Sequence, residues 1–133
     1  MKRKAKIIRY NDDKTRAICV DVETANEIGE YINRSKQHRK KFRYICDIIL
    51  ENLKNTDVYD KENINKKCKD VTAMKFFKGG TNDRIYCKEQ TLENKTFVVI
   101  TSELFEKKKT QKVKGKNKNI IEKVASHEYE IIK

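Results

Sequence analysis

Apolar residues concentrate in two short segments near the N-terminus, with a polar stretch between them. Segments 6–10 and 17–22 contain β-branched residues, and residues 11–14 between them have the composition of a turn. Short runs of this kind bounded by turn residues are typical of strands. The region is therefore predicted to form a β-hairpin.

Two helices are predicted to follow the hairpin. Thr24 is followed three residues later by Glu27, which fits a capping box and predicts a helix over 24–33. Ser35 is a candidate cap for the next helix. Over 37–53 the apolar residues step by three and four, which predicts one face of an amphipathic helix whose N-terminal half is basic.

A strand meander is predicted for the second half of the chain. Residues 54–70 are polar and lose the helical period, so they are interpreted as a connector. Three strands separated by turns follow at 71–77, 84–88 and 96–101. The unbroken apolar run 97–100 indicates a strand covered on both faces, hence central in its sheet. From residue 117 onward the pattern predicts a closing helix, with a last strand at 129–132 as the alternative.

Length and composition limit the class of protein. A chain of 133 residues has room for one domain, so residues 1–133 are predicted to form a single α+β domain. Apolar residues make up 37% and charged residues 39%, against a usual charged share of about 25%. The chain has 32 Lys and Arg against 20 Asp and Glu, a net charge of +12. This balance predicts a nucleic-acid or ribonucleoprotein partner, with biased genome composition as the alternative.

Neither a metal, nor a cofactor, nor a membrane anchor is predicted. The four cysteines form no Cys-x-x-Cys pair, which argues against a structural zinc site, and they are interpreted as buried or idle thiols. No apolar run approaches the ~18 residues of a membrane span, and no signal-peptide segment follows the basic N-terminus. A cytoplasmic protein is therefore expected.

Two basic clusters are candidate RNA-binding segments. Residues 107–118 hold seven lysines and no acid, directly after the predicted central strand. Among these, Lys107, Lys108, Lys109 and Lys112 are predicted to contact RNA phosphates. The second cluster opens the long helix and includes Arg39 and Lys40. For both clusters the alternative is a solvated surface.

Four residues of the meander are candidates for catalysis. A hairpin would bring Lys75 and Lys78 close to Arg84 and Tyr86, the last two on one face of their strand. Lysines, an arginine and a tyrosine can promote attack of an RNA 2′-hydroxyl on the adjacent phosphate by moving protons and stabilising negative charge. The hypothesis requires these cations to converge on one sheet surface with no acid between them. The alternative is a hairpin with charged outward positions.

Several segments together resemble the C-terminal half of the RelE/ParE toxin superfamily. A lysine-bearing strand, a glycine turn, an Arg-Ile-Tyr strand, an apolar strand and a basic loop occur in the family's order, at 74–80, 84–86, 96–101 and 107–109. More narrowly, 104–112 resembles a segment of phage-derived, HigB-like members. The match departs from that segment in its opening histidine and its Thr-Pro end.

The resemblance implies a fold and an activity. The implied fold is a RelE-like twisted antiparallel sheet with an N-terminal helical hairpin packed on one face and a C-terminal helix. The implied function is a toxin of a toxin–antitoxin system, a metal-independent endoribonuclease that cuts mRNA on the ribosome and is neutralised by an antitoxin protein.

Residue roles follow from the same resemblance. Lys75 and Lys78 would bind phosphate or act as base, and Arg84 would stabilise the transition state. One lysine of 107–109 would supply the basic residue after the central strand. Tyr86 is one candidate for the acid, with Tyr129 and His127 as others. Whether the chain is an enzyme stays open, because a non-catalytic relative, either a gyrase inhibitor or a basic nucleic-acid-binding protein of a phage or mobile element, would share the pattern.

Overall fold

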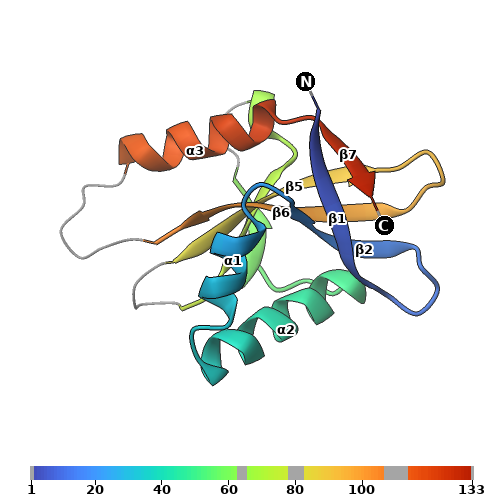
Figure 1. The fold of residues 1–133 in the computed structure, drawn as a ribbon, viewed down its shortest axis with the longest axis horizontal. Coiled ribbons are helices and arrows are strands. Elements are labelled where there is room, and N and C mark those ends of the chain that lie inside the picture. The colour runs from blue at the N-terminus through green and yellow to red at the C-terminus, as the bar shows by residue number, and fades with distance from the viewer. Residues whose placement is uncertain (1, 63–65, 78–82, 107–113, 133) are drawn as a thin grey trace.

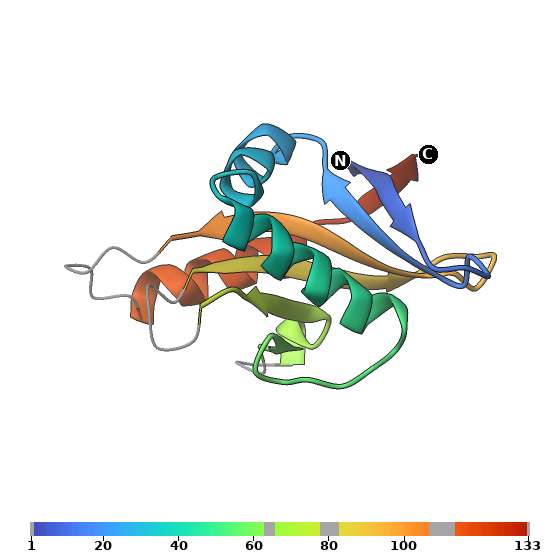
Figure 2. The same cartoon turned by 90° about the horizontal axis from the view of Figure 1, so that it is seen from below.

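Seven strands form one mixed sheet in the computed structural model, which describes residues 2–62, 66–77, 83–106 and 114–132 (Figure 1). The order across the sheet is β3-β4-β5-β6-β2-β1-β7. The strands curve together into a half-barrel, with helices on both sides of the sheet (Figures 1 and 2).

The N-terminal hairpin and the two helices occur where the pattern predicts them. The elements are β1 (Arg3–Tyr10), β2 (Arg16–Asp21), α1 (Ala25–Ile32) and α2 (Lys36–Leu50). Ser35 caps α2 as predicted, because its hydroxyl accepts a hydrogen bond from the His38 amide at 3.2 Å. The prediction of a capping box at Thr24 is wrong, because the Thr24 side chain makes no cap hydrogen bond. The Thr24 hydroxyl instead donates to the Ser102 carbonyl at 2.7 Å and ties the start of α1 to the sheet.

The meander is confirmed, but the connector before it has structure of its own. A short strand and a 3₁₀ helix occupy it, and the three meander strands follow, as β3 (Tyr59–Lys61), η1 (Lys66–Cys68), β4 (Val71–Lys75), β5 (Arg84–Thr91) and β6 (Phe97–Phe105). The predicted central position of residues 97–100 is confirmed, since β6 lies between β5 and β2. At the C-terminus both predicted alternatives form in succession, as α3 (Lys114–Ser126) and β7 (Tyr129–Ile132).

The predicted antiparallel sheet with an N-terminal helical hairpin is wrong. Strand β6 pairs with β2 in parallel, and β7 pairs with β1 in parallel. The first two helices do not open the chain, because they follow β1 and β2. Alternation reveals which face of a strand is buried but not the direction of its neighbour. The crossovers through the helices set these directions, and no local pattern encodes them.

Each face of the sheet carries its own apolar core. On one face α1 and α2 pack on residues that include Met74, Ile85 and Val99. On the other face α3 covers Ala73 and Tyr86. Successive residues of β4 and β5 therefore point to opposite cores, as the period of a strand requires. The ends of β4 and β5 near residues 75 and 84 lie at the end of the sheet that faces away from the β1–β2 hairpin (Figures 1 and 2).

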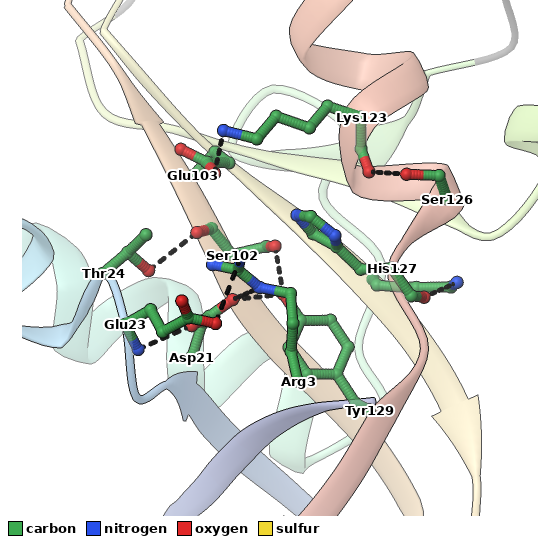
Figure 3. Close-up of polar contacts among 11 residues, drawn as sticks. Arg3, Asp21, Glu23, Thr24, Ser102, Glu103, Lys123, Ser126, His127 and Tyr129 are labelled. Carbon is green, nitrogen blue, oxygen red and sulfur yellow. Dashed lines mark hydrogen bonds and ion pairs between the residues drawn. The ribbon is translucent and has the colours of Figure 1, made fainter. Parts of the chain in front are cut away.

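A buried polar cluster ties the C-terminal strand into the sheet (Figure 3). The Asp21 side chain is fully buried and accepts hydrogen bonds from Arg3 Nε at 2.8 Å, from the Tyr129 hydroxyl at 2.6 Å and from the Glu23 amide at 2.8 Å. Burial, followed by the bond to Asp21, raises the pKa of Tyr129. Both oxygens of this carboxylate thus accept hydrogen bonds inside the protein, which makes the cluster a structural one.

Candidate functional site

Lys75 and Arg84 are partners across the β4–β5 ladder and so extend from one face of the sheet. Their charged groups then reach different neighbours. Lys75 Nζ lies 3.5 Å from the Thr56 carbonyl oxygen, at the limit of a hydrogen bond. Arg84 Nη1 donates to Glu62 Oε1 at 2.6 Å. The lysine is thus held weakly and the arginine firmly.

Glu62 is the site residue that sequence reasoning missed. It follows β3 and its amide donates to the Val71 carbonyl at 2.9 Å, which places it beside the meander. The side chain of Glu62 is 17% exposed and that of Arg84 is 30% exposed, so the ion pair is partly shielded from water. The predicted cationic surface therefore contains an acid. No local signal identifies Glu62, because its position depends on the pairing of β3 with β4.

Tyr86 lies beneath the surface. It is fully buried in the core under α3, beside Phe105 and Val124. Its hydroxyl has no hydrogen-bond partner within the described ranges. Burial, the largest cause, raises the pKa of Tyr86 to about 12. The structure does not bring this hydroxyl to a position where it would contact RNA.

Five of the predicted site residues fall outside the described residues. They are Lys78, Lys107, Lys108, Lys109 and Lys112. The other predicted RNA contacts, Arg39 and Lys40, lie exposed on the second turn of α2.

A small hollow, here called the Lys75 pocket, lies beside the paired ends of β4 and β5. It encloses about 200 Å³ and is lined by Thr56, Asp57, Lys75, Phe76, Phe77, Asp83 and Arg84. Asp83 is 5% exposed and accepts a hydrogen bond from the Tyr31 hydroxyl at 2.9 Å, so its charge is engaged in the interior. Burial, followed by this bond, raises the pKa of Tyr31.

A second hollow, here called the Tyr44 groove, adjoins the first. It encloses about 430 Å³ and is lined by Gln37, Lys40, Lys41, Tyr44, Phe76 and Phe77. Phe76 and Phe77 line both hollows, so the two form one continuous surface between α2 and the end of β4. The described lining residues of the groove include two lysines and no acid.

An aromatic cluster supports the boundary between the two hollows. The His38 ring packs edge-to-face on Phe77 with ring centres 4.9 Å apart, and Tyr31 packs in the same way on Phe76 at 5.1 Å. The Ser35 hydroxyl lies 2.6 Å from His38 Nδ1 and orients that ring. Such contacts fix the position of Phe77 at the surface.

Two larger hollows lie elsewhere and fit a polyanion less well. One, of about 740 Å³ near the tip of the β1–β2 hairpin, is lined by Asp12, Asp13, Asp47 and Glu51 among other residues. The other, of about 700 Å³ between η1 and α3, combines two lysines with Glu122. Carboxylates in the lining repel phosphates, so both hollows fit a polyanion less well than the Tyr44 groove, in which no described lining residue is acidic. The Lys75 pocket has two acids of its own, Asp57 and Asp83, and the Asp83 carboxylate is turned to the interior by its bond to Tyr31.

The thiols offer no reactive centre. All four cysteines are free and buried, as predicted. Burial raises the pKa of Cys19 and of Cys46 to about 12. In the described part of the chain, no three His, Cys, Asp or Glu residues are grouped to hold a metal ion, and none of its helices is long and apolar enough to cross a membrane.

In comparisons with protein-family models, curated proteins and solved structures, no match to this chain was found. The RelE/ParE resemblance therefore stays a prediction.

Proposed function

We propose that this protein binds RNA by its phosphate backbone, with the Lys75 pocket as the main contact. The observation that carries the proposal is the pairing of Lys75 and Arg84 across β4 and β5 at the rim of an open hollow. Among the described residues the Lys75 ammonium makes one weak contact, with a carbonyl oxygen, which a phosphate can replace. The net charge of +12 supplies the long-range attraction.

The Glu62–Arg84 pair shapes how a phosphate would bind. Arg84 can bind a phosphate with two parallel hydrogen bonds, but one of its Nη groups is occupied by Glu62. Glu62 orients the guanidinium and leaves part of its donor set for a phosphate oxygen. Binding thus uses a preoriented arginine and a freely moving lysine.

The test is the salt dependence of RNA binding, measured by fluorescence anisotropy with a labelled oligonucleotide. Each phosphate contact with a single strand contributes about 0.7 to the slope of log affinity against log salt. The double variant Lys75→Ala/Arg84→Ala should bind more weakly and flatten the slope by about 1.4. A matched control is Lys4→Ala/Lys6→Ala, which removes the same charge from exposed positions on β1.

The control pair decides whether the site is local. Equal losses in both double variants would show that only the overall charge matters and would contradict a site at the Lys75 pocket. Equal binding of RNA and of DNA of the same sequence would contradict RNA as the specific ligand.

Glu62 contradicts the requirement for a cationic surface with no acid, so the mechanism expected from the sequence does not apply in that form. A second candidate function is cleavage of the bound mRNA by a revised mechanism that includes Glu62. The observation that favours it is a carboxylate held against an arginine beside a lysine. Glu62 would take the proton of the 2′-hydroxyl as the new bond from O2′ to phosphorus forms. Arg84 would stabilise the negative charge on phosphorus oxygens, and Lys75 would donate a proton to the 5′-oxygen as its bond to phosphorus breaks.

This reaction leaves a 2′,3′-cyclic phosphate, which provides its signature. A labelled RNA should be cut by the wild type, and a 2′-deoxy substitution at the cut site should block the cut. Glu62→Gln should bind RNA and fail to cut it. Binding without any cyclic phosphate product, with or without ribosomes, would leave the protein as a non-catalytic RNA-binding protein.

A toxin role, a ribosomal site of action and an antitoxin partner are further predictions from the resemblance. Expression of the wild type should arrest translation, and expression of Arg84→Ala should not. Normal growth and intact mRNA under wild-type expression would contradict this role. DNA-damage signalling with intact mRNA would instead favour the gyrase-inhibitor alternative.

A further inference from the structure

We infer that the Tyr44 groove is a base-stacking subsite, in which an unpaired RNA base lies on the Tyr44 ring while flanking phosphates contact Lys40 and Lys41. The inference rests on the proposed RNA binding and extends it, because it specifies single-stranded RNA as the substrate class. Exposed aromatic rings between cations are the usual means of binding single strands.

The Tyr44 ring is unusually available for a helical residue of this size. Tyr44 is 45% exposed, although its neighbours Ile45 and Cys46 are buried in the core. Exposing so much aromatic surface gains nothing for folding, since the hydrophobic effect favours its burial. The ring lines a shallow, open hollow together with Phe77, which follows β4.

The orientation of the ring is held from its polar end. Asn55 Nδ2 donates to the Tyr44 hydroxyl oxygen at 3.1 Å, which anchors the tip of the ring to the segment after α2. Lys41 Nζ lies 5.9 Å from the ring centre, on one face. An anchored ring loses little conformational entropy when a planar ligand stacks on it.

The charges around the ring match a nucleic-acid strand. Lys40 is exposed and Lys41 half-buried, and no described residue of the lining is a carboxylate. The shared residues Phe76 and Phe77 connect the groove to the Lys75 pocket. A strand whose phosphate is bound by Lys75 and Arg84 would pass around the end of β4 at Phe77 to reach Tyr44 on the α2 side of the sheet. A duplex cannot present an unpaired base to the ring.

A matched tyrosine at the far end of the sheet provides the control. Tyr10 on β1 also has a lysine over its ring, with Lys14 Nζ 5.6 Å from the ring centre. It lines the hollow that contains several carboxylates. The two tyrosines thus share a cation–π contact and differ in the charge of their surroundings.

The experiment uses anisotropy with a labelled single-stranded RNA and with the duplex of the same sequence. Tyr44→Ala should weaken single-strand binding about tenfold, because stacking of one base contributes about 1–3 kcal/mol. Tyr44→Phe keeps the ring and should bind within about twofold of the wild type, as should Tyr10→Ala. The salt slope should be unchanged in Tyr44→Ala, since the ring carries no charge. Circular dichroism checks that each variant is folded.

A fluorescent reporter gives an independent readout. The chain has no Trp, so Tyr44→Trp and Tyr10→Trp each introduce a single indole. Single-stranded RNA should quench the first and leave the second unchanged. Wild-type affinity in Tyr44→Ala together with an unquenched Tyr44→Trp would overturn the stacking subsite while RNA binding stands. Absence of RNA binding by the wild type would instead overturn the proposed function.

Discussion

Two arginine–carboxylate pairs in this molecule use the same chemistry in different surroundings. In the Arg3–Asp21 pair the acid is fully buried and the arginine is 21% exposed, whereas Glu62 and Arg84 are 17% and 30% exposed. Asp21 accepts from three donors. Glu62 accepts one side-chain bond within the described ranges, from Arg84.

The difference shows which pair holds the fold and which can take part in binding. A fully buried carboxylate that accepts three hydrogen bonds inside the protein cannot exchange partners without disrupting its surroundings. A pair at the rim of an open hollow can exchange one hydrogen bond for another with water or phosphate. The first pair is therefore expected to affect stability and the second pair ligand affinity.

The largest effect is expected from Asp21→Ala. This substitution leaves the Arg3 guanidinium and the Tyr129 hydroxyl without their acceptor inside the sheet. Breaking such a buried pair costs about 3–5 kcal/mol, and urea denaturation should show a loss of that order in the free energy of unfolding. The control Glu23→Ala removes a 62% exposed acid that also pairs with Arg3, and should change stability by less than about 1 kcal/mol. Similar losses in the two variants would remove the distinction between a buried and an exposed partner.

Glu62→Gln is expected to raise the affinity for RNA. It removes a negative charge beside Arg84 that repels a phosphate, while the amide oxygen can still accept from the guanidinium, so RNA should bind about three- to tenfold more tightly, an effect of about 1 kcal/mol. The control Asp47→Asn removes the partner of Arg9, from a pair that is 43–44% exposed and distant from the Lys75 pocket. Equal gains in the two variants would mean that any lost acid raises affinity.

Two tyrosine hydroxyls extend the comparison to neutral groups. Tyr129→Phe removes the bond to Asp21 and the contact with the Ser102 hydroxyl, which should cost about 1 kcal/mol of unfolding free energy. Tyr86→Phe removes a buried hydroxyl with no partner within the described ranges, so stability should stay the same or rise. A clear loss of stability in Tyr86→Phe would show that its hydroxyl has a partner after all.

The smallest effect is expected from His127, beside the buried polar cluster (Figure 3). Burial lowers the pKa of His127, Arg3 and Lys123 lower it further, and Asp21 and Glu103 oppose them. The unfolded chain therefore takes up this proton first as the pH falls. Stability that is complete above the ordinary value of about 6.5 should decrease below it.

Chemical denaturation at pH 7.5 and pH 5.5 measures this effect. The loss of stability on acidification should be smaller in His127→Phe than in the wild type, because the variant has no imidazole to protonate. An identical pH dependence in the two proteins would show that other groups cause the acid sensitivity.

Much of the secondary structure could be predicted from local pattern. The helix over Lys36–Leu50 and the central strand β6 follow from periodicities that tertiary contacts reinforce. Strand β3 could not be predicted, because three polar residues form a strand only by pairing with β4. The candidate site likewise contains residues whose proximity could be predicted from local pattern and one residue whose position could not. The pairing of Lys75 with Arg84 follows from a hairpin, whereas Glu62 joins them only through β3.

The sequence by itself determined the charge of the protein, the faces that its helices and strands bury, and the absence of closely spaced cysteines. The tertiary structure decided the parallel pairs, the burial of Tyr86 and the partners of the two arginines. The physical reason is that periodicity records the environment of each residue one element at a time. The contacts that define a site join elements far apart in the chain, and their relative positions are set only when the whole sheet is assembled.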